Sequence, residues 1–322
     1  MAGSVFSKLV LDVARSSPVA SFAADSRLAV PLVRRFVAGE TLDQAALVAR
    51  NLNRQGMLVS LDYLGENAAN DAGAAEAARV AIETLDRMSR DRLRAYLSVK
   101  LTQLGLDVGE HMLIRGASAV LDRAKSLGIF VRFDMEGSSY TARTIEIFEL
   151  LRHDFSNVGI VIQAYLYRSA ADAERLSRIG ASIRLCKGAY DEPAHIAFRR
   201  KRDTDRNYVR IMEHLMLHGT APAIATHDPA IIEHACEFAR HENISSDRFE
   251  FQMLYGVRRD LQQQLIHRGY NVRIYVPFGG QWYPYLTRRL AERPANLLSV
   301  GGSLVRERFG GSRLSHRRLA TG

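Results

Sequence analysis

The sequence has few cysteines and no long uncharged apolar segment. Its two cysteines, Cys186 and Cys236, stand among 322 residues, and neither belongs to a Cys-x-x-Cys pair. So few cysteines exclude a disulfide-rich scaffold and disfavour a cysteine zinc site. No apolar run approaches the ~20 residues that a membrane span needs. The first apolar stretch, residues 5–14, is interrupted by Lys8 and Asp12, so we expect no signal peptide.

Several signatures of nucleotide, nucleophile and metal sites are also missing. There is no Gly-x-Gly-x-x-Gly after the first β-rich run, no P-loop, no Gly-x-Ser-x-Gly, and neither His-x-His nor His-Glu-x-x-His. A metal site built from His227, Asp228, Asp134 and Glu136 therefore has no supporting spacing, and we expect no metal. Aromatic residues do not alternate with a basic stripe, which argues against a nucleic-acid partner.

Positive charge is what the sequence has in excess. Forty-four Lys and Arg residues stand against 35 Asp and Glu, giving a net charge of +9. Such a balance is typical of proteins that bind nucleic acid, an anionic membrane surface or anionic small molecules. Residues 303–322 hold five arginines and one glutamate, so we expect a mobile basic tail over 301–322.

Alternating β-rich and helical patterns fill the middle of the chain. Eight short apolar runs start about 31 residues apart on average, which is the size of one βα unit. Stripes at helical spacing separate them, as at Leu113, Ala117, Val120 and Ala124 before Gly128. This predicts a (β/α)8 barrel over residues 57–300, with a doubly wound sheet as the alternative. The runs are Leu58–Leu64, Tyr96–Thr102, Ile129–Met135, Val158–Ala164, Ser182–Cys186, Ala223–Thr226, Phe249–Leu254 and Val272–Val276.

Short helices precede the barrel. Pro18, Pro31 and Gly39 separate them, and Thr41 with Gln44 forms a capping-box pattern before a helix over residues 45–52. We expect residues 1–56 to form a helical arm packed on the barrel.

Polar residues recur where the predicted strands end, which is where barrel enzymes carry their sites. They must pair with one another or with a ligand, because unpaired charges are costly to bury. A ring of ion pairs that only holds the barrel mouth is the alternative reading. The residues are Asp62, Glu66, Lys100, Asp134, Glu136, Gln163, Arg184, Lys187, Thr226, His227, Asp228, Gln252 and Tyr275.

The positive members of this set favour an anionic or electron-rich ligand. Lys100, Arg184 and Lys187 come from two predicted strands, and Gly188 would let backbone approach a ligand closely. A helical segment, residues 282–292, follows the last predicted strand. Its two adjacent arginines, Arg288 and Arg289, can clamp a carboxylate.

Six ordered strings carry a family resemblance that spans nearly the whole chain. The chain resembles proline dehydrogenase, most closely the short monofunctional bacterial form. The strings are Phe133–Glu136, Arg184–Tyr190, Ala225–Asp228, Phe249–Gly256, Arg273–Gly279 and Tyr285–Glu292.

The resemblance implies a distorted (β/α)8 barrel that holds FAD, with its last helix over the barrel mouth. It also implies oxidation of L-proline to Δ1-pyrroline-5-carboxylate by hydride transfer to the flavin, with a membrane quinone as electron acceptor. We therefore expect a cytoplasmic enzyme in peripheral contact with the inner face of the cell membrane. The oligomeric state stays open.

The resemblance also assigns roles to individual residues. Asp134 and Arg184 match catalytic positions, and Tyr275 resembles the proline-specific branch rather than relatives that prefer hydroxyproline. Substrate-binding positions are Lys100, Tyr190, Tyr275, Tyr285, Arg288 and Arg289. Cofactor-binding positions are Met135, Gln163, Arg184, Lys187, Gly188, Ala189, Thr226 and His227.

Two other functions stay open from the residues alone. The first is a Schiff-base lyase or aldolase that uses Lys100 or Lys187. The second is a non-enzymatic protein that acts at a membrane surface through its basic termini.

Overall fold

Eight parallel strands form a closed barrel in the computed structural model. It describes residues 29–65 and 67–292, with side chains described for 33–65 and 67–287. Each strand pairs with the next along the chain, and β8 closes the barrel against β1 over six residue pairs. The strands are β1 Leu58–Tyr63, β2 Ala95–Val99, β3 Val131–Phe133, β4 Val158–Gln163, β5 Ser182–Cys186, β6 Ala223–Ala225, β7 Glu250–Leu254 and β8 Val272–Phe278.

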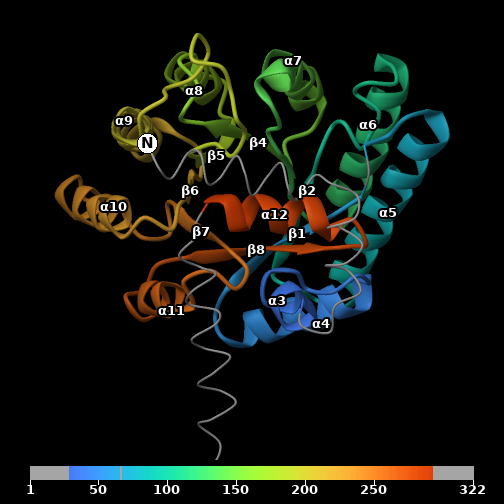
Figure 1. Cartoon of the computed structure of the whole chain (residues 1–322), viewed down its shortest axis with the longest axis horizontal. Coiled ribbons are helices and arrows are strands. Elements are labelled where there is room, and N and C mark those ends of the chain that lie inside the picture. The colour runs from blue at the N-terminus through green and yellow to red at the C-terminus, as the bar shows by residue number, and fades with distance from the viewer. Residues whose placement is uncertain (1–28, 66, 293–322) are drawn as a thin grey trace, which may run out of the picture. The chain divides into compact units, whose positions relative to one another are not determined.

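Helices connect the strands and surround the barrel (Figure 1). One helix lies between each pair of consecutive strands, as expected of parallel strands joined by crossovers. The described helices are α3 Ala29–Phe36, α4 Leu42–Arg54, α5 Asp71–Arg90, α6 Glu110–Ser126, α7 Ser138–Asp154, α8 Ser169–Arg178, α9 Lys201–His218, α10 Pro229–His241, α11 Arg259–His267 and α12 Trp282–Glu292.

The described residues fall into two compact units. The barrel unit runs from Arg34 to Trp282, and the smaller unit includes α12 beyond that residue. Within the barrel unit, α4 packs on β8 and β1, and Ala38 N donates to Pro277 O at 2.8 Å. A helix that precedes the barrel thus covers the outer seam where the last strand meets the first.

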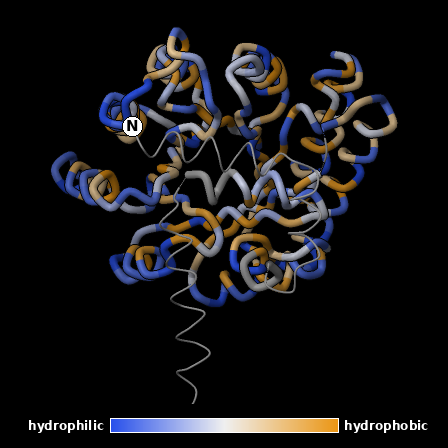
Figure 2. Tube along the Cα trace, in the orientation of Figure 1, coloured by the Kyte–Doolittle hydropathy of each residue, from blue (hydrophilic) through white to orange (hydrophobic). Residues whose placement is uncertain are grey.

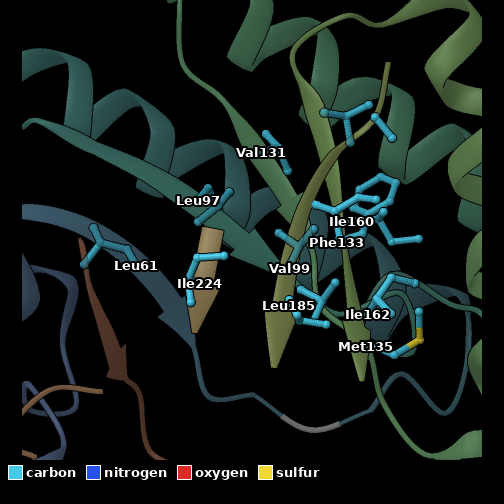
Figure 3. Close-up of a cluster of buried hydrophobic side chains, with 14 of the residues drawn as sticks. Leu61, Leu97, Val99, Val131, Phe133, Met135, Ile160, Ile162, Leu185 and Ile224 are labelled. Atoms are coloured by element: carbon cyan, nitrogen blue, oxygen red, sulfur yellow. The ribbon is translucent and has the colours of Figure 1, made fainter. Parts of the chain in front are cut away.

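The apolar core lies between the strands and the surrounding helices. Leu61, Leu97, Phe133, Ile160 and Leu185 are buried there on neighbouring strands (Figure 3). Figure 2 shows hydrophilic residues mainly on the outer turns of the helices and in the loops. Because alternate strand residues face opposite sides of a sheet, this arrangement leaves the other residues of each strand to fill the lumen.

The lumen of this barrel is polar. Arg184 on β5 reaches across it to hydrogen-bond Ser60 on β1 and Ser98 on β2, and these two serines bond each other at 2.9 Å. Barrel interiors are more often filled by Val, Ile and Leu. The polar lumen residues of this barrel therefore bond one another across it.

The sequence predictions of the fold agree with this architecture. All eight predicted runs overlap the observed strands, although β2 begins one residue before its run and β8 ends two residues after its run, and the (β/α)8 barrel is confirmed. The capping box is also present: Thr41 Oγ1 accepts from Gln44 N, and Gln44 Oε1 accepts from Thr41 N. Gly128 follows α6 at φ +66°, the left-handed conformation that ends helices.

The described residues include only part of the predicted domains. All strands lie between residues 58 and 278, inside the predicted range 57–300, while the limits themselves stay predictions. The basic tail 301–322 and the first 28 residues of the arm lie outside the described residues. In the described part, every helix is too short or too polar to cross a membrane.

Candidate active site

Asp134, Arg184 and Tyr275 form a buried cluster in the barrel lumen. Arg184 Nη1 donates to Asp134 Oδ1 at 2.8 Å, and the Tyr275 hydroxyl donates to Asp134 Oδ2 at 2.6 Å. The Arg184 guanidinium also lies 5.2 Å from the centre of the Tyr275 ring. Asp134 follows β3, while the other two residues lie within β5 and β8. Three separate elements therefore place one carboxylate between a cation and a phenol.

At neutral pH the Arg184 guanidinium is charged and the Tyr275 phenol is neutral, because the pKa values of both groups are raised. Burial opposes the charge of Arg184, but Tyr96, Asp134 and Tyr275 outweigh it and raise the arginine pKa. Burial, together with the negative charges of Asp134 and Asp62, raises the pKa of Tyr275 well above its ordinary value. Tyr275 is thus a hydrogen-bond donor at neutral pH, and Arg184 is a fixed cation.

Residues of β1 and β2 hold Arg184 from its other side. Its Nη2 atom donates to Tyr96 Oη at 3.0 Å and to Ser98 Oγ at 3.0 Å, with a longer bond to Ser60 Oγ at 3.4 Å. Arg184 Nε is buried, and no described acceptor lies within hydrogen-bond distance of it. One donor of this buried cation is therefore left for a ligand.

Lys100 and buried Asp62 form an ion pair next to this cluster. Lys100 Nζ lies 2.5 Å from Asp62 Oδ1, and Asp62 is 1% exposed. Burial and the charge of Asp134 raise the pKa of Asp62, whereas Lys100 opposes that rise. Burial alone would lower the pKa of Lys100, but Asp62 and Asp134 raise it. The ammonium group is therefore charged, as a carboxylate-binding group must be.

Gln163 and Met135 lie at the ends of β4 and β3. Gln163 Nε2 donates to the backbone oxygen of Glu136 at 2.8 Å, and Thr102 Oγ1 donates to the Glu136 carboxylate at 2.8 Å. Burial raises the pKa of Glu136. Met135 is 7% exposed. These contacts fix the chain directly after Asp134.

Lys187, directly after β5, belongs to a network of two lysines and two aspartates. Its Nζ atom lies 2.6 Å from Asp205 and 2.9 Å from Asp228, and Lys201 bonds both carboxylates as well. Burial would raise the pKa of Asp228, but the two lysines lower it to about 2. Asp228 also caps α10 by accepting from Ala230 N at 3.2 Å. Two lysines thus lie at the start of a helix that itself favours anions.

The segment after β5 has an unusual backbone at Gly188. Its φ is +115°, and a Cβ at this position would fall 2.3 Å from the Tyr165 ring. Tyr165 N donates to Lys187 O at 2.9 Å, which holds the segment against that ring. Only glycine fits this approach. Ala189 and Tyr190 follow, exposed and half-buried respectively.

Thr226 and His227 follow β6. Thr226 Oγ1 accepts from Asp228 N at 3.1 Å, and His227 Nε2 accepts from Leu254 N at 2.8 Å. An imidazole nitrogen that accepts a hydrogen bond carries no proton, which leaves any ring proton on Nδ1. His227 therefore presents a donor at its other edge.

The predicted site residues divide into those that the structure brings together and those that it does not describe. Asp134, Arg184, Tyr275 and Lys100 meet in the lumen, as the polar strand ends predicted. Tyr285, Arg288 and Arg289 lie on the predicted helix α12, but the side chains of the two arginines lie outside the described residues, as does Glu66. Their carboxylate clamp stays a prediction.

The sequence reasoning missed Tyr96, Ser60, Ser98 and Asp205. Tyr96 and the two serines lie two or more residues before the strand ends that drew attention. Their signal was the alternation of polar and apolar residues along β1 and β2, because a polar lumen face is unusual in a barrel. Among the described residues, no cluster of His, Cys, Asp and Glu could hold a metal.

Comparison with known proteins identifies the family. The family model described as proline dehydrogenase matches residues 45–300. Proline dehydrogenase 1 of Bacillus subtilis subsp. natto is 40% identical over 267 residues, which cover 83% of this chain and 88% of that protein. The proline dehydrogenase of Deinococcus radiodurans is 38% identical over 305 residues, or 93% of this chain and 98% of that protein.

A solved structure agrees with the fold. Proline utilization A (PutA) from Bdellovibrio bacteriovorus, crystallised after inactivation by N-propargylglycine, superimposes with a TM-score of 0.77 at 26% identity. The match covers 81% of this chain and about a third (32%) of that longer chain. The sequence relatives, which match over most of their own length, and the shared barrel lead to one conclusion: this chain is an oxidoreductase that belongs to the proline dehydrogenase family.

Proposed function

We propose that this protein oxidises L-proline to Δ1-pyrroline-5-carboxylate, the first step of proline catabolism. FAD would accept the hydride when bound, and the electrons would then pass to a membrane quinone. The observation that carries the proposal is the buried Asp134–Arg184–Tyr275 cluster at the carboxyl end of the barrel. Family membership adds the substrate.

The described residues fit an electron-rich cofactor. Arg184 has a buried Nε donor for which the described part of the chain offers no acceptor. Gln163 ends β4, and Thr226 and His227 follow β6. Between these two strands lies β5, after which residues 187–189 form a backbone segment that Gly188 shapes. We propose that these residues and Met135 contact FAD.

Arg184 is the residue whose charge favours the reaction. A guanidinium fixed in a low-dielectric lumen stabilises negative charge that develops beside it, and it needs no reorganisation to do so. One oxygen of the Asp134 carboxylate accepts a hydrogen bond from this guanidinium, and the other accepts one from the Tyr275 hydroxyl. We infer that Asp134 and Arg184 are the catalytic residues, and that Tyr275 forms one wall of the proline site.

The substrate carboxylate needs a cationic partner. Lys100, whose side chain is largely buried and charged, supplies one in the lumen. We propose that Arg288 and Arg289 complete this site and that Tyr190 and Tyr285 enclose the ring.

The structure gives no support to a Schiff-base mechanism. Such a lysine must be neutral to attack a carbonyl, whereas Lys100 has a raised pKa and an ion pair with Asp62. Lys187 is bound by two carboxylates. Borohydride trapping of either lysine with a carbonyl substrate would reverse this conclusion.

A spectroscopic titration tests the oxidation. The purified protein, reconstituted with FAD, is mixed with L-proline without oxygen, and its flavin absorbance is followed. We expect the flavin absorbance to bleach and to recover on addition of a soluble quinone. D-proline at equal concentration is the control. Unchanged absorbance with L-proline, in protein that binds FAD, would contradict the proposal.

Contact with the inner face of the membrane is a further part of the proposal. The net charge of +9 suits an anionic lipid surface. We propose that residues 303–322 supply part of this attraction. Their deletion should weaken sedimentation with anionic vesicles at low salt, and vesicles of neutral lipid are the control. Equal binding by the truncated protein would show that the tail has no such role, which also tests the alternative of a membrane-surface protein.

A further inference from the structure

A cavity lies at the end of the barrel opposite to the active site. It has a volume of about 290 Å³. Residues at the amino ends of the strands line it, among them Tyr96 at the start of β2, Arg132 within β3 and Arg273 at the start of β8. The Asp134–Arg184–Tyr275 cluster does not line this cavity. The two sites thus lie at different levels of the same lumen.

Positive charge predominates in this cavity. Four arginines line it, namely Arg132, Arg152, Arg248 and Arg273, with Asp247 and Glu250 as the acidic side chains. Arg273 is already neutralised, because its Nε and Nη2 atoms bond both oxygens of Glu250 at 2.8 and 2.9 Å. Besides Glu250, the remaining three arginines share the cavity with one other carboxylate, that of exposed Asp247.

Arg132 is the most unusual of these residues. It is 2% exposed. Its two terminal nitrogens bond neutral acceptors, the backbone oxygens of Ile160 and Ser182 and the Ser182 hydroxyl, at 2.9 to 3.1 Å. No carboxylate in the described part of the chain lies within 4 Å of this guanidinium, and its buried Nε has no acceptor there. A buried cation with only neutral acceptors is expensive to keep unless an anion joins it.

The surroundings hold the Arg132 guanidinium in place. The rings of Phe130 and Tyr96 lie 5.1 and 5.4 Å from it. Burial lowers the pKa of Arg132 and the charge of Arg184 lowers it further, while Tyr96 and the more distant Glu250 carboxylate offset only part of that fall. Arg152, on the wall of the cavity, has a buried Nε with no acceptor among the described residues and one long bond of 3.5 Å to Gly180 O. Two guanidinium groups therefore keep donors that the described protein does not use.

We propose that this cavity is a binding site for a small anion of the phosphate or carboxylate class. Arg132 would lie at its floor, with Arg152 and Arg248 at its rim. Guanidinium groups bind the oxygens of such anions through pairs of parallel hydrogen bonds. The cavity volume lies at the low end for ligand sites, so the anion is small. This site is separate from the one that oxidises proline.

A purely structural role for Arg132 is the competing explanation. Its bonds tie β3 to β4 and β5, so its replacement could unfold the barrel without any anion being involved. The rim residues separate the two explanations, because Arg152 and Arg248 lie outside the lumen network and can be replaced without breaking it. The test therefore uses Arg152→Gln and Arg248→Gln, with Arg54→Gln as the matched control. Arg54 is exposed on α4 and bonds only a neutral side chain among the described residues.

Calorimetric titration of the FAD-loaded protein measures binding of inorganic phosphate and of malonate at constant ionic strength. We expect the wild type and Arg54→Gln to bind at least one of these anions with equal Kd. Each rim variant should bind it at least about tenfold more weakly, because a charge-assisted bond is lost. Which anion binds more tightly identifies the class.

The same proteins are assayed with L-proline to place the anion. We expect kcat and KM of the rim variants to equal those of the wild type, and added anion to leave KM unchanged. Binding of neither anion to the wild type, or equal Kd in all variants, would overturn the proposal. Competition with L-proline would also overturn it, because the anion would then occupy the active site.

Discussion

Arg184 and Tyr96 are joined by a 3.0 Å hydrogen bond in which the guanidinium donates to the phenol oxygen. Gln252 Nε2 donates to the same oxygen at 2.5 Å. Burial alone would raise the pKa of Tyr96, but the charges of Arg184, Arg132 and Arg273 outweigh it and lower the pKa below its ordinary value. Tyr96 therefore acts as an acceptor between the arginine of the active site and those of the opposite cavity.

Tyr96→Phe tests whether this phenol positions Arg184. The variant removes an acceptor from a buried guanidinium, and bonds to charged groups contribute about 1.5–3 kcal/mol. We expect kcat for L-proline to fall about tenfold, with a smaller change in KM and a shift in the flavin reduction potential.

Tyr208→Phe is the matched control for Tyr96→Phe. Tyr208 is fully buried, and its hydroxyl donates to Leu185 O at 3.1 Å without touching Arg184. It should lower the melting temperature and leave kcat and the potential unchanged. If both variants lose stability alone, Tyr96 has only a structural role.

Lys100→Met should destabilise the barrel strongly. Asp62 would be left in the lumen without its ion-pair partner, and breaking a buried pair costs about 3–5 kcal/mol. Asp62→Asn in the same chain should recover most of that loss, because no buried charge then remains. Urea unfolding of the two single variants and the double variant measures the coupling. Additive losses would show that the two residues do not interact.

Activity separates the second role of Lys100 from its structural one. If Lys100 binds the substrate carboxylate, the double variant should be stable yet show a raised KM for L-proline. Recovery of KM along with stability would remove Lys100 from the substrate site.

Protonation of Asp228 in acid should make the protein less stable. Its folded-state pKa is lowered to about 2 from an ordinary value of 3.8. For an acid with a depressed pKa, the stabilisation is present above the unfolded-state pKa and is lost as the pH falls through the folded-state pKa. The contribution, about 2 kcal/mol, should thus disappear between about pH 5 and pH 2.

Asp228→Asn measures this contribution. Asparagine keeps an oxygen for the N-cap of α10 and loses the charge. The free energy of unfolding of the variant should therefore fall less steeply than that of the wild type between pH 5 and pH 3. Asp122→Asn, at an exposed position on α6, should follow the wild type. Parallel curves for Asp228→Asn would show that the lysine network does not stabilise the fold.

The strands were predictable because their signal is local. Eight short apolar runs alternate with helical stripes, and both the runs and their parallel order follow from that pattern. The residues at strand ends were predictable for the same reason, since parallel strands end on one face of the barrel. Asp134, Arg184 and Tyr275 therefore converged as expected.

The partners of these residues were harder to predict because they depend on register and on distance across the barrel. The bond from Arg184 to Tyr96 links residues 88 positions apart, and nothing near either residue in the sequence indicates it. Arg132 was missed for a different reason. In the sequence, a single arginine within an apolar run gives no sign of a site. The structure places this arginine beside other arginines that line the same cavity.

Arg288→Lys and Arg289→Lys test the predicted carboxylate clamp. Lysine keeps the charge but cannot form the paired bonds of a guanidinium. We expect KM for L-proline to rise about tenfold or more in each variant, the loss of one charge-assisted bond, with a smaller effect on kcat. Arg54→Lys is the control and should behave as the wild type.

Pyrrolidine, which lacks the carboxylate, shows whether the clamp acts on that group. If the arginines bind the carboxylate, the wild type and both clamp variants should oxidise pyrrolidine equally slowly. The variants would then lose activity on L-proline alone. Unchanged KM for L-proline, or an equal loss on both substrates, would mean that these arginines act on something other than the carboxylate, such as the position of α12 itself.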